Sequence, residues 1–311
     1  MSLSVWIGPH GGESISPPEV SVATAGDWFS LLKPRVMTLV VFTGLVGLLV
    51  APGTLHPVLA LTAILCIAVG AGAAGAINMW YDRDIDAVMR RTARRPIPDG
   101  RIAPADALGF GIALAVASVL VMGLATNVAA GAILAASILF YVFVYTMWLK
   151  RRTPQNIVIG GGAGAFPPLV GWAAMTGHLS WAAWLMFLVV FLWTPPHFWS
   201  LALYRQDDYR RARIPMMPVV RGERVTKWQS LVYAILLVAA SGALYLTHVV
   251  GVAYLVVALA VGLGFVALNV RLLVERLPEV RWARTTFRFS LLYLTVIFAA
   301  MVLDVPHLFG G

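Results

Sequence analysis

Charged residues are scarce in this sequence. Asp, Glu, Lys and Arg make up only 12% of its 311 residues, and 60% of the residues are hydrophobic. In soluble domains about a quarter of the residues are charged, so the composition excludes a water-soluble globular protein. Most of the chain must instead lie in lipid.

Cysteine is almost absent, and the N-terminal region lacks basic residues. Cys66 is the single cysteine, so no internal disulfide can form, and its place in an apolar run favours core packing. The first 30 residues contain Glu13, Glu19 and Asp27 but no Lys or Arg. This composition is not that of a signal peptide or of an arginine-rich transit peptide. We expect residues 1–30 to be a disordered cytoplasmic tail.

Long apolar runs make up most of what is present. An apolar run of about 18 residues is long enough to cross the hydrocarbon core as a helix, and these runs lack the alternating pattern of the roughly ten-residue strands of a β-barrel. We therefore predict an all-α polytopic membrane bundle of nine transmembrane helices, forming a single domain over residues 31–311. The runs are 36–53, 57–80, 105–125, 128–148, 157–175, 182–203, 229–247, 251–272 and 286–304.

Basic residues are missing from alternate connections between these runs. All 23 Lys and Arg fall in the connections of one side or in the flanks of the adjoining runs, and the connections of the other side have none. Lys and Arg mark the cytoplasmic side, which predicts a cytoplasmic N-terminus and a periplasmic C-terminus in a bacterial inner membrane. The same separation indicates that the net charge of +9 serves membrane orientation and not nucleic-acid binding.

Opposed charges gather at the end of the second run, in NMWYDRDIDAVMRRTARRP (78–96). Positions four apart share one face of a helix, so Asn78, Asp82 and Asp86 stack, whereas Asp84 lies about half a turn off that face. Amide and carboxylate oxygens at successive turns can hold Mg²⁺. The alternative is a solvated helix end whose acids pair with the following arginines.

A second polar ladder ends the sixth run, in WTPPHFWSLALYRQDDYRRAR (193–213). His197, Tyr204 and Asp208 are spaced to lie in one helical stripe, and we expect Pro195 and Pro196 to break the helix above them. Arginines follow this ladder too, and arginine forks grip phosphate oxygens bidentately. Acids, metal and arginines beside a lipid-facing cavity favour a substrate with a diphosphate head and an apolar tail, an isoprenyl diphosphate.

These strings resemble the UbiA superfamily of intramembrane prenyltransferases. The first ladder matches its Asn-x-x-x-Asp-x-x-x-Asp motif, including the trailing RRTARRP. The strings RRTPQNIVIGGGAGAFPPLVGW (151–172), WTPPHFWSLALYRQDDY (193–209) and ARIPMMPVVRG (212–222) resemble the branch that farnesylates heme, and the four motifs cover a large share of the chain. The chain departs from the superfamily pattern at Tyr204 and His197, where acids usually stand.

The resemblance implies Mg²⁺-dependent transfer of farnesyl from farnesyl diphosphate to a vinyl group of heme B, giving heme O, at the cytoplasmic face. It also implies the lipid bilayer as surroundings and heme A synthase as a candidate partner. The residues expected to catalyse are Asp82, Asp86, Asp208, Tyr204 and His197. The expected metal ligands are Asn78, Asp82, Asp86 and Asp208. The expected diphosphate ligands are Arg91, Arg95 and Arg210, and the acceptor ligands are His197 and Asn156.

Several alternatives stay open at this point. His197 is a candidate heme ligand, a candidate acid or base, or a structural hydrogen-bonding group. The glycines of GGGAGAFPP favour close helix packing over a phosphate cradle. Another aromatic or tetrapyrrole acceptor is the nearest rival function. A transporter of anionic substrates is a rival of another class, although transporters usually show internal repeats, which are not evident here.

Overall fold

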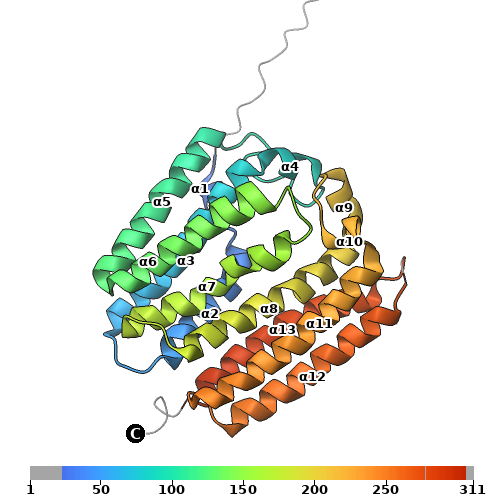
Figure 1. Cartoon of the computed structure of the whole chain (residues 1–311). Coiled ribbons are helices and arrows are strands. Elements are labelled where there is room, and N and C mark those ends of the chain that lie inside the picture. The colour runs from blue at the N-terminus through green and yellow to red at the C-terminus, as the bar shows by residue number, and fades with distance from the viewer. Residues whose placement is uncertain (1–22, 277, 306–311) are drawn as a thin grey trace, which may run out of the picture.

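The computed structural model describes residues 23–276 and 278–305, and within these residues it contains helices and no strand. Figure 1 shows the long helices lying side by side, with short helices α4, α9 and α10 gathered near one end. The long helices are α2 (Pro34–Val50), α3 (Pro57–Tyr81), α5 (Pro104–Ala125), α6 (Val128–Leu139), α7 (Asn156–Thr176), α8 (Trp181–Leu203), α11 (Gly222–Ala243), α12 (Val252–Val274) and α13 (Arg281–Leu303). The short ones are α1 (Ala25–Leu31), α4 (Arg83–Val88), α9 (Gln206–Arg211) and α10 (Met217–Val220).

The predicted all-α membrane bundle is confirmed. Eight helices of the described chain are long and apolar enough to cross a membrane, and the bent pair α1 and α2 gives up to nine. Two spans change their helix type along their length. α6 continues as the π-helical segment η1 (Phe140–Leu149), and α11 continues as the 3₁₀ turn η2 (Leu244–Thr247). The last long helix, α13, packs against both α8 and α2.

The first described segment differs from the expected tail. Residues 25–30 belong to α1, which begins with a capping box in which Thr24 and Asp27 each accept a hydrogen bond from the other's backbone N–H. Arg101 also forms an ion pair with the buried Asp27 carboxylate. The ordered part therefore begins before residue 31, because a local cap and one distant arginine hold this short helix. The remaining tail, residues 1–22, lies outside the described residues.

The expected helix break at Pro195 and Pro196 was wrong. Both prolines lie inside α8, which continues to Leu203. A proline removes one backbone donor but its φ fits a helix, so the cost is two missing hydrogen bonds and not a necessary chain break. The Pro196 carbonyl accepts a hydrogen bond from the Ser200 hydroxyl at 2.6 Å, and the Thr194 hydroxyl donates to the Val190 carbonyl at 2.9 Å.

Close packing by glycine is confirmed for the segment 160–171. A Cβ atom at Gly171 would lie 2.0 Å from the Gly44 carbonyl oxygen, so α7 and α2 approach with their backbones almost in contact. A Cβ at Gly160 would lie 2.1 Å from the ring of Tyr145 in η1. These contacts draw α7 against both neighbours, as small residues do in membrane bundles.

A separate apolar cluster holds the short helices in place. It joins α4, α8, α9 and α10 through buried side chains that include Ile85, Met89, Trp199, Tyr209 and Met217. Trp199 is fully buried. This cluster brings the ends of the two polar ladders to the same end of the bundle.

Candidate functional site

The first polar ladder keeps the spacing expected for one helix face, although its helix bends. α3 ends at Tyr81 and α4 begins at Arg83, yet the Asp82 N–H donates to the Asn78 carbonyl at 2.9 Å and the Asp86 N–H donates to the Asp82 carbonyl at 2.8 Å. Asn78 and Asp86 are 3% exposed and Asp82 is fully buried. The ladder therefore lies in the interior of the bundle end and not in water.

Each member of this ladder is held by a basic side chain, and two of these side chains come from distant parts of the chain. Lys33 donates to the Asn78 side-chain oxygen at 2.7 Å. Lys150 forms an ion pair with Asp82, and Arg95 forms one with Asp86 at 2.6 Å. Buried carboxylates of this kind need partners, because an unpaired charge in the interior is costly.

The amide group of Asn78 links three segments. Its nitrogen donates to the Asp82 carboxylate at 2.7 Å and to the Thr146 hydroxyl of η1 at 3.0 Å. Lys33 lies between α1 and α2 with a φ of 52°, in the left-handed region. Strained backbone and π-helical turns concentrate at functional sites, and here both lie against the acid ladder.

Asp84 lies off the buried face, as its position two residues from Asp82 predicts. It is exposed and accepts two hydrogen bonds from Arg151, at 2.8 and 2.7 Å. These hydrogen bonds lower the pKa of the Asp84 carboxyl. Arg151 also lies 3.4 Å from the Asp82 carboxylate, so it links the outer acid to the inner one.

Sequence reasoning missed Lys33, Thr146, Lys150 and Arg151 as members of this site. The two lysines could have been noticed in the sequence, because lysine is rare in this chain: only 3 of its 23 basic residues are Lys. Lys33 and Lys150 each adjoin the start or end of an apolar run, where a buried partner can be reached. The sequence around each lysine does not indicate which buried residue it contacts.

The predicted diphosphate-binding arginines lie in three different settings. Arg95 contacts Asp86, as described above. Arg91 is exposed. Burial raises the pKa of the Tyr209 phenol, and the positive charge of Arg91 partly opposes this rise. Arg210 is exposed and contacts Gln206 and Asp207 of its own helix. The structure therefore brings Arg95 to the acid ladder, whereas Arg210 does not reach it.

The second polar ladder does not form one continuous stripe, and this expectation was wrong. α8 ends at Leu203 and Tyr204 turns toward α13, where its ring lies 6.1 Å from that of Phe287. Asp208 lies on α9, is 5% exposed, and pairs with Arg211 of the same helix. The helix change at Leu203 gives the two side chains different directions.

His197 is enclosed by aromatic rings. Its ring stacks on Trp193 at 4.2 Å and on Phe287 at 4.7 Å between ring centroids. Its Nδ1 lies 2.6 Å from the Ser290 hydroxyl oxygen, and the Trp193 indole donates to the Ser290 carbonyl at 2.7 Å. These contacts tie α8 to α13.

The proposed acceptor ligand Asn156 is buried beside the first ladder. Its side-chain nitrogen donates to the Lys150 carbonyl at 3.3 Å, and its side-chain oxygen is buried with no hydrogen-bond partner among the described residues. Asn156 therefore supports the turn that carries Lys150, and its free oxygen is available to a bound polar group.

The four expected metal ligands are not drawn into one group. Within residues 23–276 and 278–305, no three His, Cys, Asp or Glu side chains lie together as a metal site. The donor atoms of Asn78, Asp82 and Asp86 are oxygens at successive turns, the type that Mg²⁺ prefers. These three fit the metal in chemical type, while Asp208 stands apart on α9.

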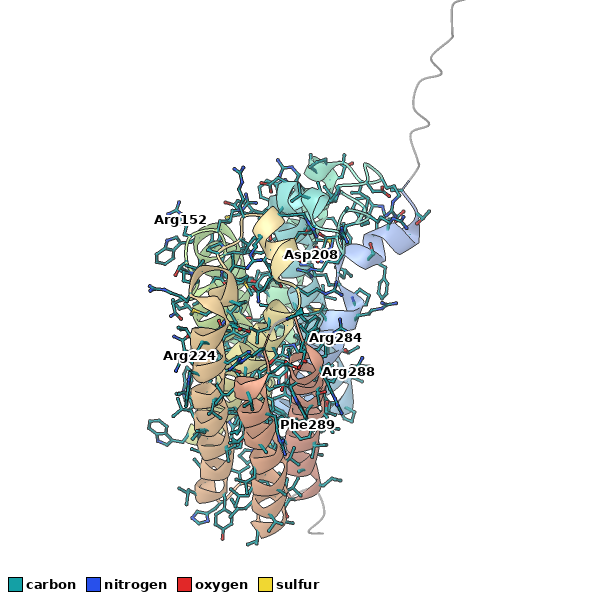
Figure 2. The ribbon with its side chains drawn as sticks, turned by 90° about the vertical axis from the view of Figure 1, so that its right-hand side faces the viewer. Arg152, Asp208, Arg224, Arg284, Arg288 and Phe289 are labelled. Atoms are coloured by element: carbon teal, nitrogen blue, oxygen red, sulfur yellow. The ribbon has the colours of Figure 1, made fainter. Side chains whose placement is uncertain are left out.

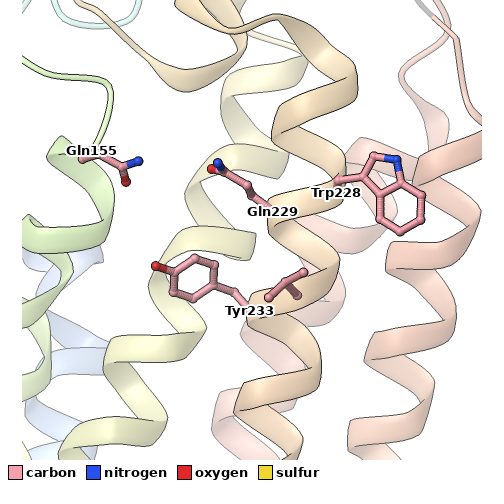
Figure 3. Close-up of a pocket in the computed structure, with 5 residues that line it drawn as sticks. Gln155, Trp228, Gln229 and Tyr233 are labelled. Carbon is pink, nitrogen blue, oxygen red and sulfur yellow. The ribbon is translucent and has the colours of Figure 1, made fainter.

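Two hollows lie between the segment just before α7 and helix α11. One has a volume of about 260 Å³ and is lined by Gln155, Trp228, Gln229, Val232 and Tyr233, as Figure 3 shows. The second, of about 340 Å³, shares Gln155 and Gln229 with it. Neither is lined by a predicted site residue.

Comparison with known proteins decides the family. The profile of the UbiA prenyltransferase family matches residues 40–293. The chain belongs to this family. The matched range includes both polar ladders and all the predicted site residues.

Curated relatives of this family member are similar over almost their whole length. A protein of Acidiphilium cryptum is 58% identical over 289 residues, covering 91% of both chains. One of Granulibacter bethesdensis is 56% identical, covering 98% of this chain and 99% of its own. One of Gluconacetobacter diazotrophicus is 60% identical, covering 90% and 91%. All three are named protoheme IX farnesyltransferase.

Solved structures confirm the UbiA fold at low sequence identity. A digeranylgeranylglyceryl phosphate synthase is similar with a TM-score of 0.75 and 18% identity, covering 90% of this chain and 97% of its own. A UbiA homolog from Archaeoglobus fulgidus bound to GPP and Mg²⁺ gives a TM-score of 0.67 and 17% identity, covering 88% and 99%. The family member described here is an integral membrane protein of the same architecture.

Proposed function

We propose that this chain transfers a farnesyl group from farnesyl diphosphate to a vinyl group of heme B, giving heme O and diphosphate. The observation that carries the proposal is 56–60% identity, over about nine tenths of both chains, to relatives named protoheme IX farnesyltransferase. The buried acid ladder with its basic partners supports the same reaction, since it is suited to a charged head group at the edge of lipid.

The donor site is proposed at the first ladder. Asn78, Asp82 and Asp86 would hold Mg²⁺, and Asp208 would join them through movement of α9. When bound, the metal neutralises phosphate oxygens and so favours departure of diphosphate. Lys33, Lys150 and the predicted Arg91 and Arg95 would bind the diphosphate, with Arg151 beside them. The same movement of α9 would bring the predicted Arg210 to it.

Basic side chains stabilise the buried acids of the site before substrate binds. Lys150 and Arg95 neutralise the two buried aspartates, and Lys33 occupies the oxygen of Asn78. A diphosphate brings negative charge to the same place, so these cations can turn from carboxylate to phosphate while staying paired. Pre-positioned cations stabilise charge that develops on the leaving group.

The chemical step needs a cavity without water while the farnesyl group is transferred. One water molecule is needed afterwards, to add to the heme side chain. The bond between farnesyl C1 and the diphosphate oxygen breaks, and its electron pair leaves with diphosphate. A vinyl carbon of heme B attacks C1, which leaves a positive charge on the carbon next to the macrocycle. Water adds there and loses a proton, giving a hydroxyethylfarnesyl group. Apolar walls protect the allylic cation from earlier attack by water.

The roles proposed for Tyr204 and His197 are fewer than the catalytic and acceptor-binding roles expected from the sequence. Tyr204 remains a candidate for contact with the acceptor, because it lies at the surface of the bundle end near α13. His197 is proposed as a positioning residue that holds α8 to α13 through Ser290. Asn156 remains a proposed acceptor contact through its free oxygen.

We also propose an orientation in a bacterial inner membrane. The N-terminus and the active site would face the cytoplasm and the C-terminus the periplasm, because all 23 Lys and Arg lie in the connections of one side or in the flanks of the adjoining runs. Residues 31–311 would form a single membrane domain. Heme A synthase, which would consume heme O, is the proposed protein partner.

The deciding experiment is an assay of the purified protein with heme B, farnesyl diphosphate and Mg²⁺, with products identified by mass. We expect a product with the mass of heme B plus one farnesyl group and one hydroxyl group. Farnesylation of a different tetrapyrrole or aromatic acceptor, with heme B unchanged, would favour the first rival function. Transport of anions into vesicles without any farnesylated product would favour the second.

The orientation has a separate test. A reporter fused after Arg95 or Arg224 should read cytoplasmic, and one fused at the C-terminus should read periplasmic. A cytoplasmic C-terminus would contradict the nine-span arrangement, because each added or lost span reverses the side on which the chain ends.

A further inference from the structure

A second basic group lies around Tyr204, and among its described residues only Arg205 lies within ion-pair distance of an acid, 3.9 Å from Asp208. The guanidinium of Arg284 on α13 lies 5.7 Å from the centre of the Tyr204 ring, and that of Arg205 lies 5.9 Å from it. Burial raises the pKa of the Tyr204 phenol, and the positive charges of Arg205, Arg284 and Arg288 oppose this rise. Among the described residues, no carboxylate lies within ion-pair distance of Arg284 or Arg288.

Arg288 lies inside a candidate membrane span, where a charged side chain without an acid partner is unusual. α13 is a candidate span over Arg281–Leu303, and a rise of 1.5 Å per residue places Arg288 about 10 Å along it. Figure 2 shows Arg284 and Arg288 following one another down α13, with Asp208 nearer the end that carries α9. Charge within a span is costly and usually marks a functional site. An anion is therefore expected to reach these two arginines.

Aromatic surface adjoins the two arginines. Phe287, the neighbour of Arg288 in the chain, stacks on His197 and lies 6.1 Å from the Tyr204 ring. Phe287 and Tyr204 are partly buried, so part of each ring is open. A ligand that joins carboxylates to a flat apolar ring system would fit both the charges and the aromatic surface.

We propose that Arg284 and Arg288 bind the two propionate carboxylates of heme B and so orient this acceptor in the site. The inference rests on the proposed function and adds the residues that would recognise the acceptor. Heme B carries its propionates on one edge and its vinyl groups on the opposite edge. Propionates held at α13 therefore turn the vinyl edge away from α13, toward the interior of the bundle.

The geometry of the two arginines suits this role. They are one turn apart on α13, which separates their backbones by about 6 Å along the axis. Each guanidinium can grip a carboxylate with two parallel hydrogen bonds. The two propionates are flexible and sit on neighbouring rings of the macrocycle, so one arginine can serve each.

The diphosphate is a poorer fit to this second group. The donor site already has Lys33, Lys150 and Arg95 at the acid ladder. Two separate sets of cations match two anionic substrates that meet at one end of the bundle.

The test compares heme B with its dimethyl ester, in which both propionate charges are removed. Each is titrated by Soret absorbance into the wild-type protein and into Arg284→Gln, Arg288→Gln and the double variant. We expect each substitution to weaken heme B binding by about ten-fold, the size of one lost charge-assisted contact. Affinity for the dimethyl ester should stay unchanged in every variant.

Arg271→Gln is the matched control. Arg271 is an exposed arginine of α12 whose guanidinium lies 5.9 Å from the centre of the Trp282 ring, and we expect it to leave both affinities unchanged. Arg284→Lys keeps the charge but not the forked donor, so it should recover part of the lost affinity for heme B. Product mass from the same preparations reports the proposed function independently.

Three outcomes would overturn the inference. Equal losses for heme B and its ester would show that the arginines support the fold and not the propionates. Unchanged heme affinity, with activity that follows the anionic lipid content of the vesicles, would assign them to lipid head groups. Farnesylated heme from the wild-type protein without any preference for heme B over the ester would leave the proposed function standing and this inference refuted.

Discussion

The two polar ladders look alike in the sequence but are packed in different ways. Each sets polar side chains at helical spacing at the end of an apolar run and is followed by arginines. In the first ladder every buried acid meets a basic side chain, and Asp82 meets one from 68 positions away in Lys150. In the second, Asp208 pairs within its own short helix, while His197 is closed in by aromatic rings.

This difference teaches that spacing reports a shared face and not a shared function. The first ladder keeps its face through a bend because the backbone hydrogen bonds from Asp82 and Asp86 continue across it. The second loses its face because α8 ends at Leu203 and α9 takes a new direction. The first is thus the stronger candidate for the donor site, whereas in the second His197 and Tyr204 pack against α13 and Asp208 pairs on α9.

The largest expected effect comes from removing the divalent metal. Excess chelator should reduce farnesyl transfer to background, because the buried ladder has the oxygen donors that Mg²⁺ prefers. Activity should return on adding Mg²⁺ in excess of chelator, as measured by product mass. Full turnover in excess chelator would contradict metal binding at the first ladder.

Substitution within the first ladder should have the next largest effect. Asp82→Asn or Asp86→Asn should lower kcat by about 10²–10³-fold, the range for loss of one preorganised electrostatic contact. Each change removes a buried charge and leaves Lys150 or Arg95 without its ion-pair partner. Steady-state kinetics with each substrate varied would measure it.

Heme binding is the control for these two variants. Soret titration should give nearly wild-type affinity, because the ladder is proposed to serve the diphosphate. A loss of heme affinity equal to the loss of kcat would instead show that the first ladder organises the whole site.

His197→Ala should affect stability before it affects substrate use. The substitution removes a ring stacked between Trp193 and Phe287 and a hydrogen bond to Ser290. We expect a loss of about 2–4 kcal/mol in the free energy of unfolding, as for other large buried side chains. Thermal unfolding in detergent would measure it.

The heme spectrum separates the remaining interpretations of His197. A structural role predicts an unchanged Soret position for His197→Ala and a milder loss of stability for Ser290→Ala. A shifted Soret band would restore His197 as a heme ligand. Normal stability and spectrum with slow turnover would favour an acid or base.

Asp84→Asn should give the smallest effect and sharpens the contrast within the first ladder. Asp84 is exposed, so its pair with Arg151 should contribute about 0–1 kcal/mol, and turnover should stay near the wild-type value. A loss of turnover comparable to that of Asp82→Asn would contradict the division between buried and exposed acids.

The same pair predicts a dependence on pH. Hydrogen bonds from Arg151 lower the pKa of Asp84 in the folded protein, so the pair stabilises the fold above the usual aspartate pKa of about 3.9. This contribution is lost as the pH falls through the lowered pKa. The difference in unfolding temperature between wild-type protein and Asp84→Asn should therefore vanish in acid.

The sequence by itself determined the membrane bundle and the first ladder. Continuous apolar runs require helices, because in lipid the backbone must satisfy its own hydrogen bonds. The spacing of Asn78, Asp82 and Asp86 placed them on one face and left Asp84 outside, since a helix repeats every 3.6 residues. The strings around both ladders also indicated the UbiA family, which the profile match over residues 40–293 bears out.

Only the tertiary structure decided which side chains meet. Lys33 and Lys150 reach the ladder because α2, α3 and η1 pack together, and no periodicity within one helix specifies its neighbour. The enclosure of His197 and the position of Arg284 over Tyr204 likewise depend on how α13 lies against α8. Sequence spacing defines the face of a single helix, whereas the partner of a buried charge is set by packing between helices far apart in the chain.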